Sequence, residues 1–380
     1  MEFTLLSVSD FCLYEEVSAC RNFFQSVNMY HRYIELGYET YLVGVKRDGK
    51  VVAASLLVAL GKSICGYKIF NAYKGFLLDY SDFELLEFFT KEVKNFLRKK
   101  KCIKLFIDPY IVSVERDKDG NKVRGGVNNL FVKYKLLSLG YKYLGEVEQV
   151  KWTYVLEFNN RSKEDIFKNF KSNVRNYINK TNNKYVINIR KLSYGELADF
   201  KRITSMSAEK QGFVDKSLKY YQSMYDHFGD KVEYLITELD VKKTRGKLLR
   251  LLSDSKDKDS ILNELEKLDC LDSNVIPLAA GMFIYYGSEV IYLFSGNDPK
   301  YVKYYGCYAL QWYVIQKAIE NNYKRYNFFG IKMDKDDGVF TFKKGFNGNV
   351  EELLGTFELK ISNVCYIYNF IKKIMSTKKS

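Results

Sequence analysis

The segment Phe342-Lys343-Lys344-Gly345-Phe346 contains the residue types in this 380-residue chain that best fit a reaction centre. Two lysines between two phenylalanines can place a positive charge and an aromatic ring next to a reacting group. The same letters after a strand also fit a turn whose ammonium groups are solvated. The residues alone leave both interpretations open.

A second candidate is Asp108, which ends the apolar run 103–108 and precedes Pro109. The run is typical of a buried strand. Ligands collect at strand ends in α/β sheets, so Asp108 is a candidate catalytic carboxylate. Asp-Pro is also a common way to terminate a strand, and that structural interpretation stays open.

The elements that must position these residues occur twice in the same order. The order is strand, strand, strand, helix, strand, first over 41–46, 51–60, 67–73, 83–100 and 103–108, then over 232–237, 276–286, 290–296, 306–320 and 326–330. This is the order of the acyltransferase unit that binds acyl donors along a splayed central sheet. A chain with two such units is expected to move an acyl group between two large substrates.

We therefore expect an α/β (α+β) fold made of two tandem acyltransferase (GNAT-like) domains. The first covers 1–158 and is joined by a C-terminal helix at 362–377, and the second covers 159–361. A helical hairpin over 240–273 interrupts the second domain where the first has a tight turn, because leucines and isoleucines recur there at helical spacing. A second copy of the chain could pair with this hairpin to form an oligomer.

Composition limits the class of protein. The hydrophobic share of 47% is that of a globular chain, and the net charge of +14 favours polyanionic partners such as nucleic acid, phosphorylated substrates or an anionic membrane face. A lysine-rich surface with no such partner is the alternative. Seven scattered cysteines indicate reduced thiols, and two histidines make a metal site or a Ser-His triad improbable. No signal peptide or membrane span is recognised, so we expect a cytoplasmic protein.

Several motifs together resemble the Fem aminoacyltransferases, which build the interpeptide bridge of peptidoglycan, and most closely the FemA and FemB branch. They are the opening Met1-Glu-Phe-Thr, the run 37–46, Asp108-Pro109, Ala309-Leu-Gln-Trp, 325–330 and 342–346, and they keep their order over nearly the whole chain. The resemblance implies an aminoacyl-tRNA donor and a lipid II acceptor, or a related muropeptide, at the inner membrane face. It implies no metal and no cofactor. The reaction is aminolysis of an activated ester through a tetrahedral oxyanion.

The resemblance also implies roles for individual residues. Phe342 would stack against substrate, Lys343 would stabilise the developing negative charge, and Asp108 would receive the proton of the attacking amine. A preorganised cation at an oxyanion contributes on the order of 3 kcal/mol. Water or a substrate phosphate could take the proton in place of Asp108.

Acceptor-binding residues follow from the same match. Lys216 and Tyr220 would hold the acceptor diphosphate, with Lys216 at a family arginine position, and Tyr292 would contact the acceptor. A lysine supplies charge but lacks the bidentate fork of arginine, so phosphate binding is expected to be looser. A solvated lysine and packed tyrosines are the structural alternatives. At another diphosphate-binding lysine of the family this chain has Tyr33, which puts that contact in doubt.

Basic residues on helical segments are candidates for binding the tRNA phosphates. They are Lys168, Lys171 and Arg175 in 162–181, and Lys247 at the base of the hairpin. A solvated helix face explains them equally well. Two other functions remain open: an acetyl-CoA-dependent N-acetyltransferase, which Tyr308 in the pyrophosphate-loop position disfavours, and a non-catalytic relic that only binds tRNA or muropeptide.

Overall fold

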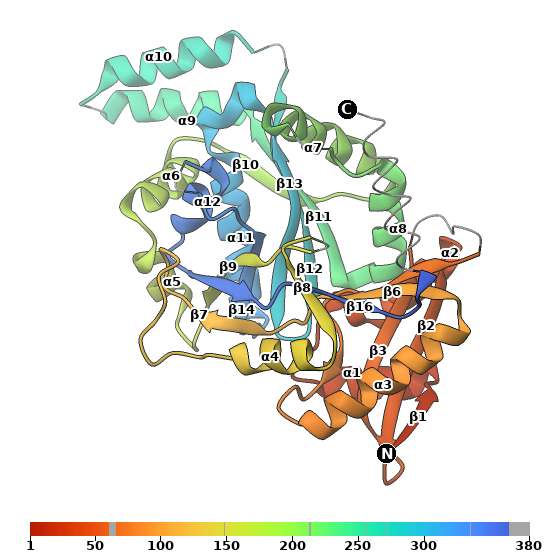
Figure 1. Ribbon diagram of the computed structural model, residues 1–380. Helices are drawn as coiled ribbons and strands as arrows, with labels where there is room; N and C mark the ends of the chain where they lie inside the picture. Colours follow the sequence, from red (N-terminus) through yellow and green to blue (C-terminus); the bar gives the residue numbers. More distant parts are fainter. Residues whose placement is uncertain are drawn as a thin grey trace, which may run out of the picture. The chain divides into compact units, whose positions relative to one another are not determined.

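The computed structural model describes residues 1–60, 66–147, 149–212, 214–254, 256–271, 273–334 and 336–364 (Figure 1). The chain divides into two compact units. The first unit is Met1–Thr153 with Val350–Ser380, and the second is Tyr154–Asn349. The expected C-terminal helix 362–377 lies, from residue 365 onward, outside the described residues.

The first unit is built on one mixed sheet. Its strands lie in the order β1 (Glu2–Leu5), β2 (Glu39–Arg47), β3 (Lys50–Ala59), β4 (Lys68–Ala72), β6 (Cys102–Ile107), β16 (Thr356–Lys360) and β8 (Tyr141–Gly145), and β5 (Leu77–Leu78) pairs with β3. β2, β3 and β4 are antiparallel in succession, and β4 and β6 are parallel. β7 (Val112–Glu115) pairs antiparallel with β15 (Asn349–Leu353).

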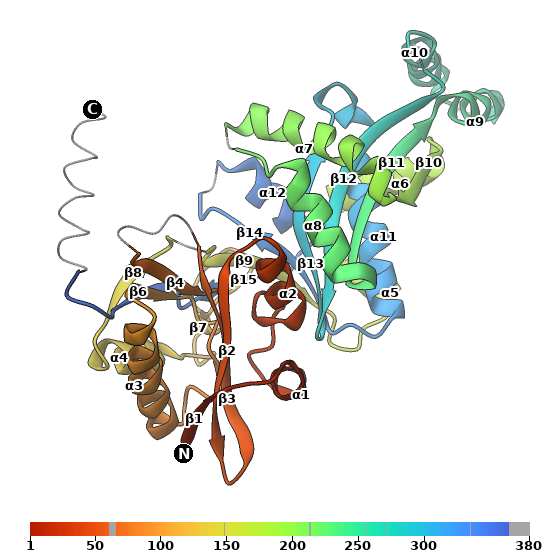
Figure 2. The same ribbon diagram turned by 90° about the vertical axis from the view of Figure 1, so that its right-hand side faces the viewer.

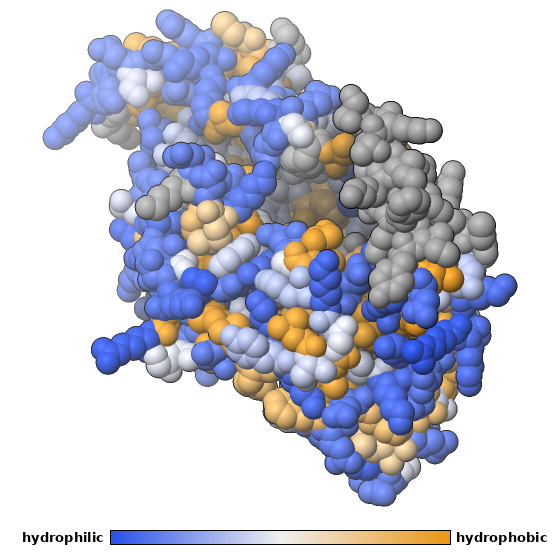
Figure 3. Space-filling view, viewed as in Figure 1, coloured by the Kyte–Doolittle hydropathy of each residue, from blue (hydrophilic) through white to orange (hydrophobic). Residues whose placement is uncertain are grey.

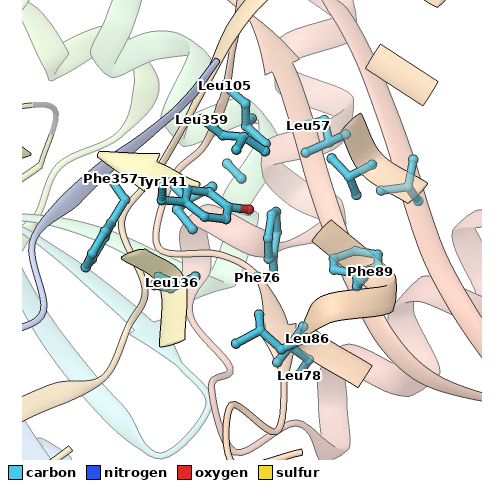
Figure 4. Packing of buried hydrophobic residues seen from close by; sticks show 14 of the residues in the cluster. Leu57, Phe76, Leu78, Leu86, Phe89, Leu105, Leu136, Tyr141, Phe357 and Leu359 are labelled. Carbon is cyan, nitrogen blue, oxygen red and sulfur yellow. The ribbon is translucent and has the colours of Figure 1, made fainter. Parts of the chain in front are cut away.

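Helices cover both faces of this sheet. α3 (Phe83–Lys99) lies on one side, and α1 (Val8–Val17) and α2 (Val27–Glu35) lie on the other, as Figure 2 shows. The short η1 (Phe23–Gln25) precedes α2, and α4 (Leu130–Ser138) packs beside β8. The apolar stripe of α3 is the reason it docks, because Leu86, Phe89 and Val93 are fully buried and recur at helical spacing. Figure 4 shows Leu86 and Phe89 of α3 in the same core as Phe357 and Leu359 of β16.

The second unit is built on a sheet of the same pairing pattern. Its strands lie in the order β10 (Ile187–Lys191), β11 (Val232–Asp240), β12 (Val275–Tyr286), β13 (Glu289–Asn297), β14 (Arg325–Gly330) and β9 (Trp152–Glu157). β11, β12 and β13 are antiparallel in succession, and β13 and β14 are parallel. The parallel pairing covers only the start of β13, from Glu289 to Ile291.

Helices flank this second sheet on both sides. α7 (Leu197–Gln211) and α8 (Leu218–Phe228) lie on one side, and α5 (Lys163–Asn169), α6 (Ser172–Asn183) and α11 (Gly306–Glu320) lie on the other (Figure 2). The remaining helical pieces are η2 (Tyr194–Glu196), η3 (Gly229–Lys231), η4 (Pro299–Tyr304) and α12 (Gly338–Lys344).

The two units repeat one arrangement, which confirms the predicted fold class. β2-β3-β4-α3-β6 and β11-β12-β13-α11-β14 share the element order and the pairing sequence of two antiparallel contacts followed by a parallel one. A helix that connects two parallel neighbours is the standard crossover solution in α/β sheets.

Two helices fill the interruption of the second unit. α9 (Val241–Asp254) and α10 (Lys258–Asp269) follow β11 and precede β12 in the sequence. The two helices lie side by side (Figure 1). Leu248, Ile261, Leu265 and Leu268 are buried with residues at the base of the hairpin. Leu249, Leu251 and Leu262 stay exposed, and Figure 3 shows apolar side chains among hydrophilic ones over this hairpin.

The structure differs from the sequence-based expectation at two places. β16 pairs with β6 and β8 of the first unit, whereas the sequence predicts that 159–361 belongs to the second domain. The segment 162–181 is two helices, because Phe170 takes an extended conformation between α5 and α6. Its ring is buried against Phe167, Trp312 and Phe346, so packing interrupts the helix where no glycine or proline does.

Candidate functional site

Lys343 is buried in the last turn of α12. Asp337 caps the start of this helix, and its carboxylate accepts from the backbone amides of Val339 and Phe340. The Lys343 side chain is only 6% exposed, and its Nζ donates to the Gly330 carbonyl at the end of β14, at 2.6 Å. Burial lowers the pKa of Lys343 to about 7, and the negative charge of Asp337 opposes this only in part. A lysine in this state exchanges a proton near neutral pH.

Gly345 of the motif 342–346 is required for close packing next to Lys343. Gly345 lies so close to α6 that an added Cβ would stand 2.5 Å from Val174 Cγ2. The Gly345 carbonyl also accepts from the Lys171 amide at 2.9 Å. The glycine therefore lets α6 and α12 pack closely, and this contact holds Lys343 and Phe342 in place.

We expect Gly345→Ala to weaken this contact. Gly345 has a helical φ of −61°, so the substitution tests packing and not backbone conformation. Because the new methyl group must displace Val174, the free energy of unfolding should fall by about 1–3 kcal/mol. Chemical denaturation measures the effect, and Gly338→Ala is the control, since a Cβ there meets nothing within 4 Å. Equal stability of both variants would contradict the proposed close packing.

Phe342 is half-buried and belongs to an aromatic cluster. The centroid of its ring lies 5.0 Å from that of Tyr308 and 5.5 Å from that of Phe346, and both contacts are edge-to-face. Phe346 is fully buried and contacts Phe170 and Phe328. Phe342 is thus supported from beneath by buried rings while part of its own surface remains accessible.

Lys216 and Tyr220 lie together at the start of α8. Lys216 is exposed, and its Nζ lies 5.5 Å from the centre of the Tyr220 ring. Tyr220 packs edge-to-face on Phe294 of β13 at 5.7 Å. The start of α8 therefore places a cation next to a tyrosine ring.

Asp215 organises this segment, and no motif in the sequence indicates this role. Its carboxylate accepts from Lys201 Nζ at 2.7 Å, from the Thr204 hydroxyl at 2.8 Å and from the Tyr221 hydroxyl at 2.5 Å. It also accepts from the Lys216 amide at 2.8 Å. Burial raises the pKa of Asp215, but the hydrogen bonds from these partners outweigh burial and lower it overall.

Tyr292 lies on β13 and does not join Lys216 and Tyr220. The register of β12 and β13 shifts between Met282 and Phe283, which face Phe294 and Tyr292. Phe294 contacts α8, whereas Tyr292 is 9% exposed and stacks on Phe283 at 5.3 Å. Burial raises the pKa of Tyr292, and the thiol of Cys307 in α11 adds to the rise.

Asp108 belongs to the first unit, directly after β6. Its side chain is buried, and Oδ1 accepts from the Thr356 hydroxyl at 2.5 Å. This contact ties the end of β6 to the start of its neighbour β16, so the residue has a structural task whether or not it takes a proton.

The four candidate tRNA-binding residues fall into two kinds. Lys168 and Lys171 are exposed. Arg175 donates to the carbonyls of Lys168 and Phe170, both at 2.6 Å, and Lys247 donates to the carbonyls of Asn182 and Tyr185. Arg175 and Lys247 therefore satisfy the carbonyls at the ends of α5 and α6, which favours a structural task for these two.

No group of metal-ligating side chains occurs among the described residues. Within the same residues, no helix has the length and apolar character that crossing a membrane requires.

Comparison with known proteins identifies the family. The FemAB family model matches residues 6–267 and 250–373. Aminoacyltransferase FemA of Staphylococcus epidermidis is 30% identical over 98% of this chain and all of its own length, and FemB of the same species is 29% identical over all of both. The chain belongs to the FemAB family and is an aminoacyltransferase of the kind that acts in peptidoglycan bridge synthesis.

Solved structures agree on the fold. A FemX crystal structure superimposes with a TM-score of 0.76 at 18% identity, covering 95% of this chain and 97% of that one. A tandem GNAT protein from the clavulanic acid pathway has a TM-score of 0.53 at 8% identity, covering 95% and 98%. The resemblance and enzyme class inferred from the sequence are confirmed.

Proposed function

We propose that the enzyme transfers an amino acid from aminoacyl-tRNA to the peptide stem or growing bridge of lipid II, at the inner face of the membrane. The family implies these two substrates. The observation that carries the proposal is Lys343, a desolvated lysine with a pKa of about 7 next to the accessible ring of Phe342.

The proposed chemistry is aminolysis. A neutral amine of the acceptor attacks the ester carbonyl of the donor, and the C–N bond forms as a tetrahedral oxyanion develops. The Lys343 ammonium would donate a hydrogen bond to this oxyanion in a site where desolvation strengthens the interaction. Collapse of the intermediate breaks the C–O bond and releases the ribose hydroxyl of the tRNA.

Asp108 is proposed to accept the proton that the attacking amine loses. We expect Asp108→Asn to lower kcat by about 10²-fold or more, because the amide can still accept from Thr356 but cannot take a proton at neutral pH. Steady-state kinetics test this, with Thr356→Val as the control for loss of the hydrogen bond alone. Unchanged kcat in Asp108→Asn would assign proton removal to water or to a substrate phosphate.

Lys216 and Tyr220 are proposed to bind the diphosphate of the acceptor, and Tyr292 to contact the same substrate. We expect Lys216→Ala to raise KM for a lipid II analogue about tenfold or more with kcat little changed, since charge-assisted hydrogen bonds contribute about 1.5–3 kcal/mol. Lys216→Arg should lower KM below wild type through its bidentate geometry.

The matched control for Lys216 is Lys219→Ala, an exposed lysine one turn along the same helix start. If Lys219→Ala raises KM as much as Lys216→Ala, the effect is one of general surface charge. In that case the proposed diphosphate contact is wrong.

Lys168, Lys171, Arg175 and Lys247 are proposed to face the tRNA, with the first two as the stronger candidates because these residues are exposed. Each phosphate contact should contribute a slope of about −0.7 to −0.9 to the logarithmic dependence of affinity on salt.

The exposed apolar residues of the α9–α10 hairpin are proposed to mediate oligomerisation.

The deciding experiment supplies the purified enzyme with a pool of charged tRNAs and a lipid II analogue and identifies the product by mass spectrometry. A muropeptide heavier by one amino acid supports the proposal and names the amino acid. Transfer from acetyl-CoA, with thermal stabilisation by CoA and none by the muropeptide, would favour an N-acetyltransferase. Binding of tRNA without turnover for every amino acid would favour the non-catalytic relic.

A further inference from the structure

Three half-buried tyrosines extend the accessible surface of Phe342. They are Tyr177 of α6, Tyr305 directly before α11, and Tyr308 in the first turn of α11. Together with Phe342 we call them the aromatic shelf. Each ring contacts another, with centroid distances of 4.5 Å for Tyr177 and Tyr305, 4.9 Å for Tyr177 and Tyr308, and 5.0 Å for Tyr308 and Phe342.

The shelf has a rigid foundation. Tyr308 lies nearly parallel to the fully buried Phe346, with centroids 6.1 Å apart and planes at 23°. Tyr177 follows Val174 by almost one helical turn, and Val174 is the residue packed against Gly345. The contact that fixes Lys343 therefore also positions the turn of α6 that carries Tyr177.

The backbone at Tyr305 is unusual. Its φ is +59°, a left-handed conformation that side chains other than glycine, asparagine and aspartate rarely adopt. The next residue, Gly306, has no room for a Cβ, which would stand 2.5 Å from Leu278 Cβ. The result is that the Tyr305 ring lies flat on Tyr177, with an interplanar angle of 11°. Uncommon backbone conformations that survive in a packed structure cluster at binding sites.

Positive charge adjoins the shelf. Lys180 Nζ lies 5.5 Å from the centre of the Tyr305 ring, one turn beyond Tyr177 on the same helix. Lys171, at the other end of α6, is exposed. Accessible aromatic rings next to lysines are the combination with which proteins bind single-stranded nucleic acid, because bases stack on the rings and phosphates pair with the cations.

We propose that the aromatic shelf stacks the unpaired 3′-terminal base of the RNA that carries the amino acid. The inference rests on the proposed donor, aminoacyl-tRNA. The amino acid is esterified to the ribose of that terminal nucleotide, so a base stacked on an outer face of the Tyr177–Tyr305 pair directs its ester toward Phe342 and Lys343. The aromatic shelf selects for a flat aromatic group. This binding role explains why the tyrosines at the start of α11 are only half-buried.

The test is a double-mutant cycle between protein and RNA. Wild type and Tyr177→Leu are each assayed with a normal aminoacyl-tRNA and with one whose terminal nucleotide is abasic but carries the same amino acid. In wild type, removal of the base should raise KM for the donor about 10- to 100-fold, in proportion to the stacking energy. In Tyr177→Leu, removal of the base should raise KM for the donor by a much smaller factor. KM of this variant for the normal donor should already be higher than that of wild type.

Matched variants isolate the ring. Tyr177→Phe should behave as wild type, because it keeps the aromatic face. Tyr301→Leu should also behave as wild type, since Tyr301 is a half-buried tyrosine that packs with the hairpin core and not with Phe342. A donor with 2-aminopurine at the terminal position gives a readout without any variant, and its fluorescence should be quenched on binding the wild-type enzyme.

The outcomes separate this proposal from the proposed function. If wild type uses both donors and removal of the base costs the same factor in wild type and Tyr177→Leu, the shelf does not bind the base. A raised KM for the muropeptide in place of the donor would assign the shelf to the acceptor and overturn the inference. If wild type uses neither donor, the proposed function itself is wrong.

Discussion

Replacing Lys343 with methionine should lower kcat about 10²- to 10³-fold while making the protein more stable. The loss of rate is what removal of a preorganised oxyanion donor costs. The gain in stability arises because methionine fills the same volume without a charge that burial disfavours. Opposite signs for activity and stability are the mark of a residue kept for function at a cost to the fold.

The pH dependence of stability follows from the pKa of Lys343, which is about 7 in the folded protein against 10.5 for an ordinary lysine. Between these values the unfolded chain binds a proton that the folded chain lacks, so the free energy of unfolding rises with pH across this window. Below about pH 7 both states are protonated and burial of the charge costs its full amount, on the order of a few kcal/mol. In Lys343→Met this dependence should vanish.

The pH dependence of the rate uses an arginine variant as reference. Arginine stays charged throughout, so the ratio of the wild-type rate to the Lys343→Arg rate should fall as pH rises through about 7, when wild type loses its ammonium. Dividing the rates removes the titration of the attacking amine. A ratio that rises with pH would make Lys343 a base and not an oxyanion donor.

Lys344→Met is the matched control for both measurements. Lys344 is the neighbouring lysine, only partly buried, with its Nζ 5.8 Å from the centre of the Phe340 ring. We expect kcat within a few-fold of wild type and no gain in stability. Unchanged kcat in Lys343→Met would remove Lys343 from the reaction centre.

Replacing Asp215 with alanine should lower the free energy of unfolding by about 3–5 kcal/mol, because it leaves Lys201 without its carboxylate and Tyr221 and Thr204 without their acceptor. The segment that presents Lys216 would lose its anchor, so KM for the acceptor should rise as well. Chemical denaturation and steady-state kinetics measure the two effects.

The pH dependence of this contribution has the opposite sign to that of Lys343. The pKa of Asp215 is lowered in the folded protein, so its stabilising effect is complete above the ordinary aspartate pKa and is lost as pH falls through the lowered value. Asp199→Ala is the control, since Asp199 is an exposed carboxylate on α7, the helix that carries Lys201 and Thr204, and its Oδ1 lies 3.8 Å from Arg202 Nε. We expect it to change stability by less than about 0.5 kcal/mol. Equal effects of the two substitutions would contradict the role of Asp215.

The repeated strands and helices were predictable from the sequence for a physical reason. Long apolar runs such as 51–60 and the helical stripe of 83–100 carry enough residues for their periodicity to be unambiguous. β16 was missed because Phe357 and Leu359 give only one alternation, and nothing local indicates that they complete the core of the first unit. α12 was missed because it is too short for its periodicity to show.

The candidate site was predictable only in part. The motif 342–346 drew attention to Lys343, but its burial depends on Val174, Gly330 and the packing of distant segments. Asp215 left no signal, since Lys201, Thr204 and Tyr221 surround it only after α7 and α8 have formed. A carboxylate three residues before Leu218, the first residue of α8, gives no local pattern that would indicate such a network.

The position of β16 has a consequence for synthesis on the ribosome. Its Phe357 and Leu359 lie between β6 and β8, and all of the second unit is translated before they are. The sheet of the first unit therefore lacks the strand between β6 and β8 until the second unit has been synthesised. A nascent chain that stops anywhere before residue 356 exposes the unpaired edges of β6 and β8. Such a chain is a target for chaperones and proteases.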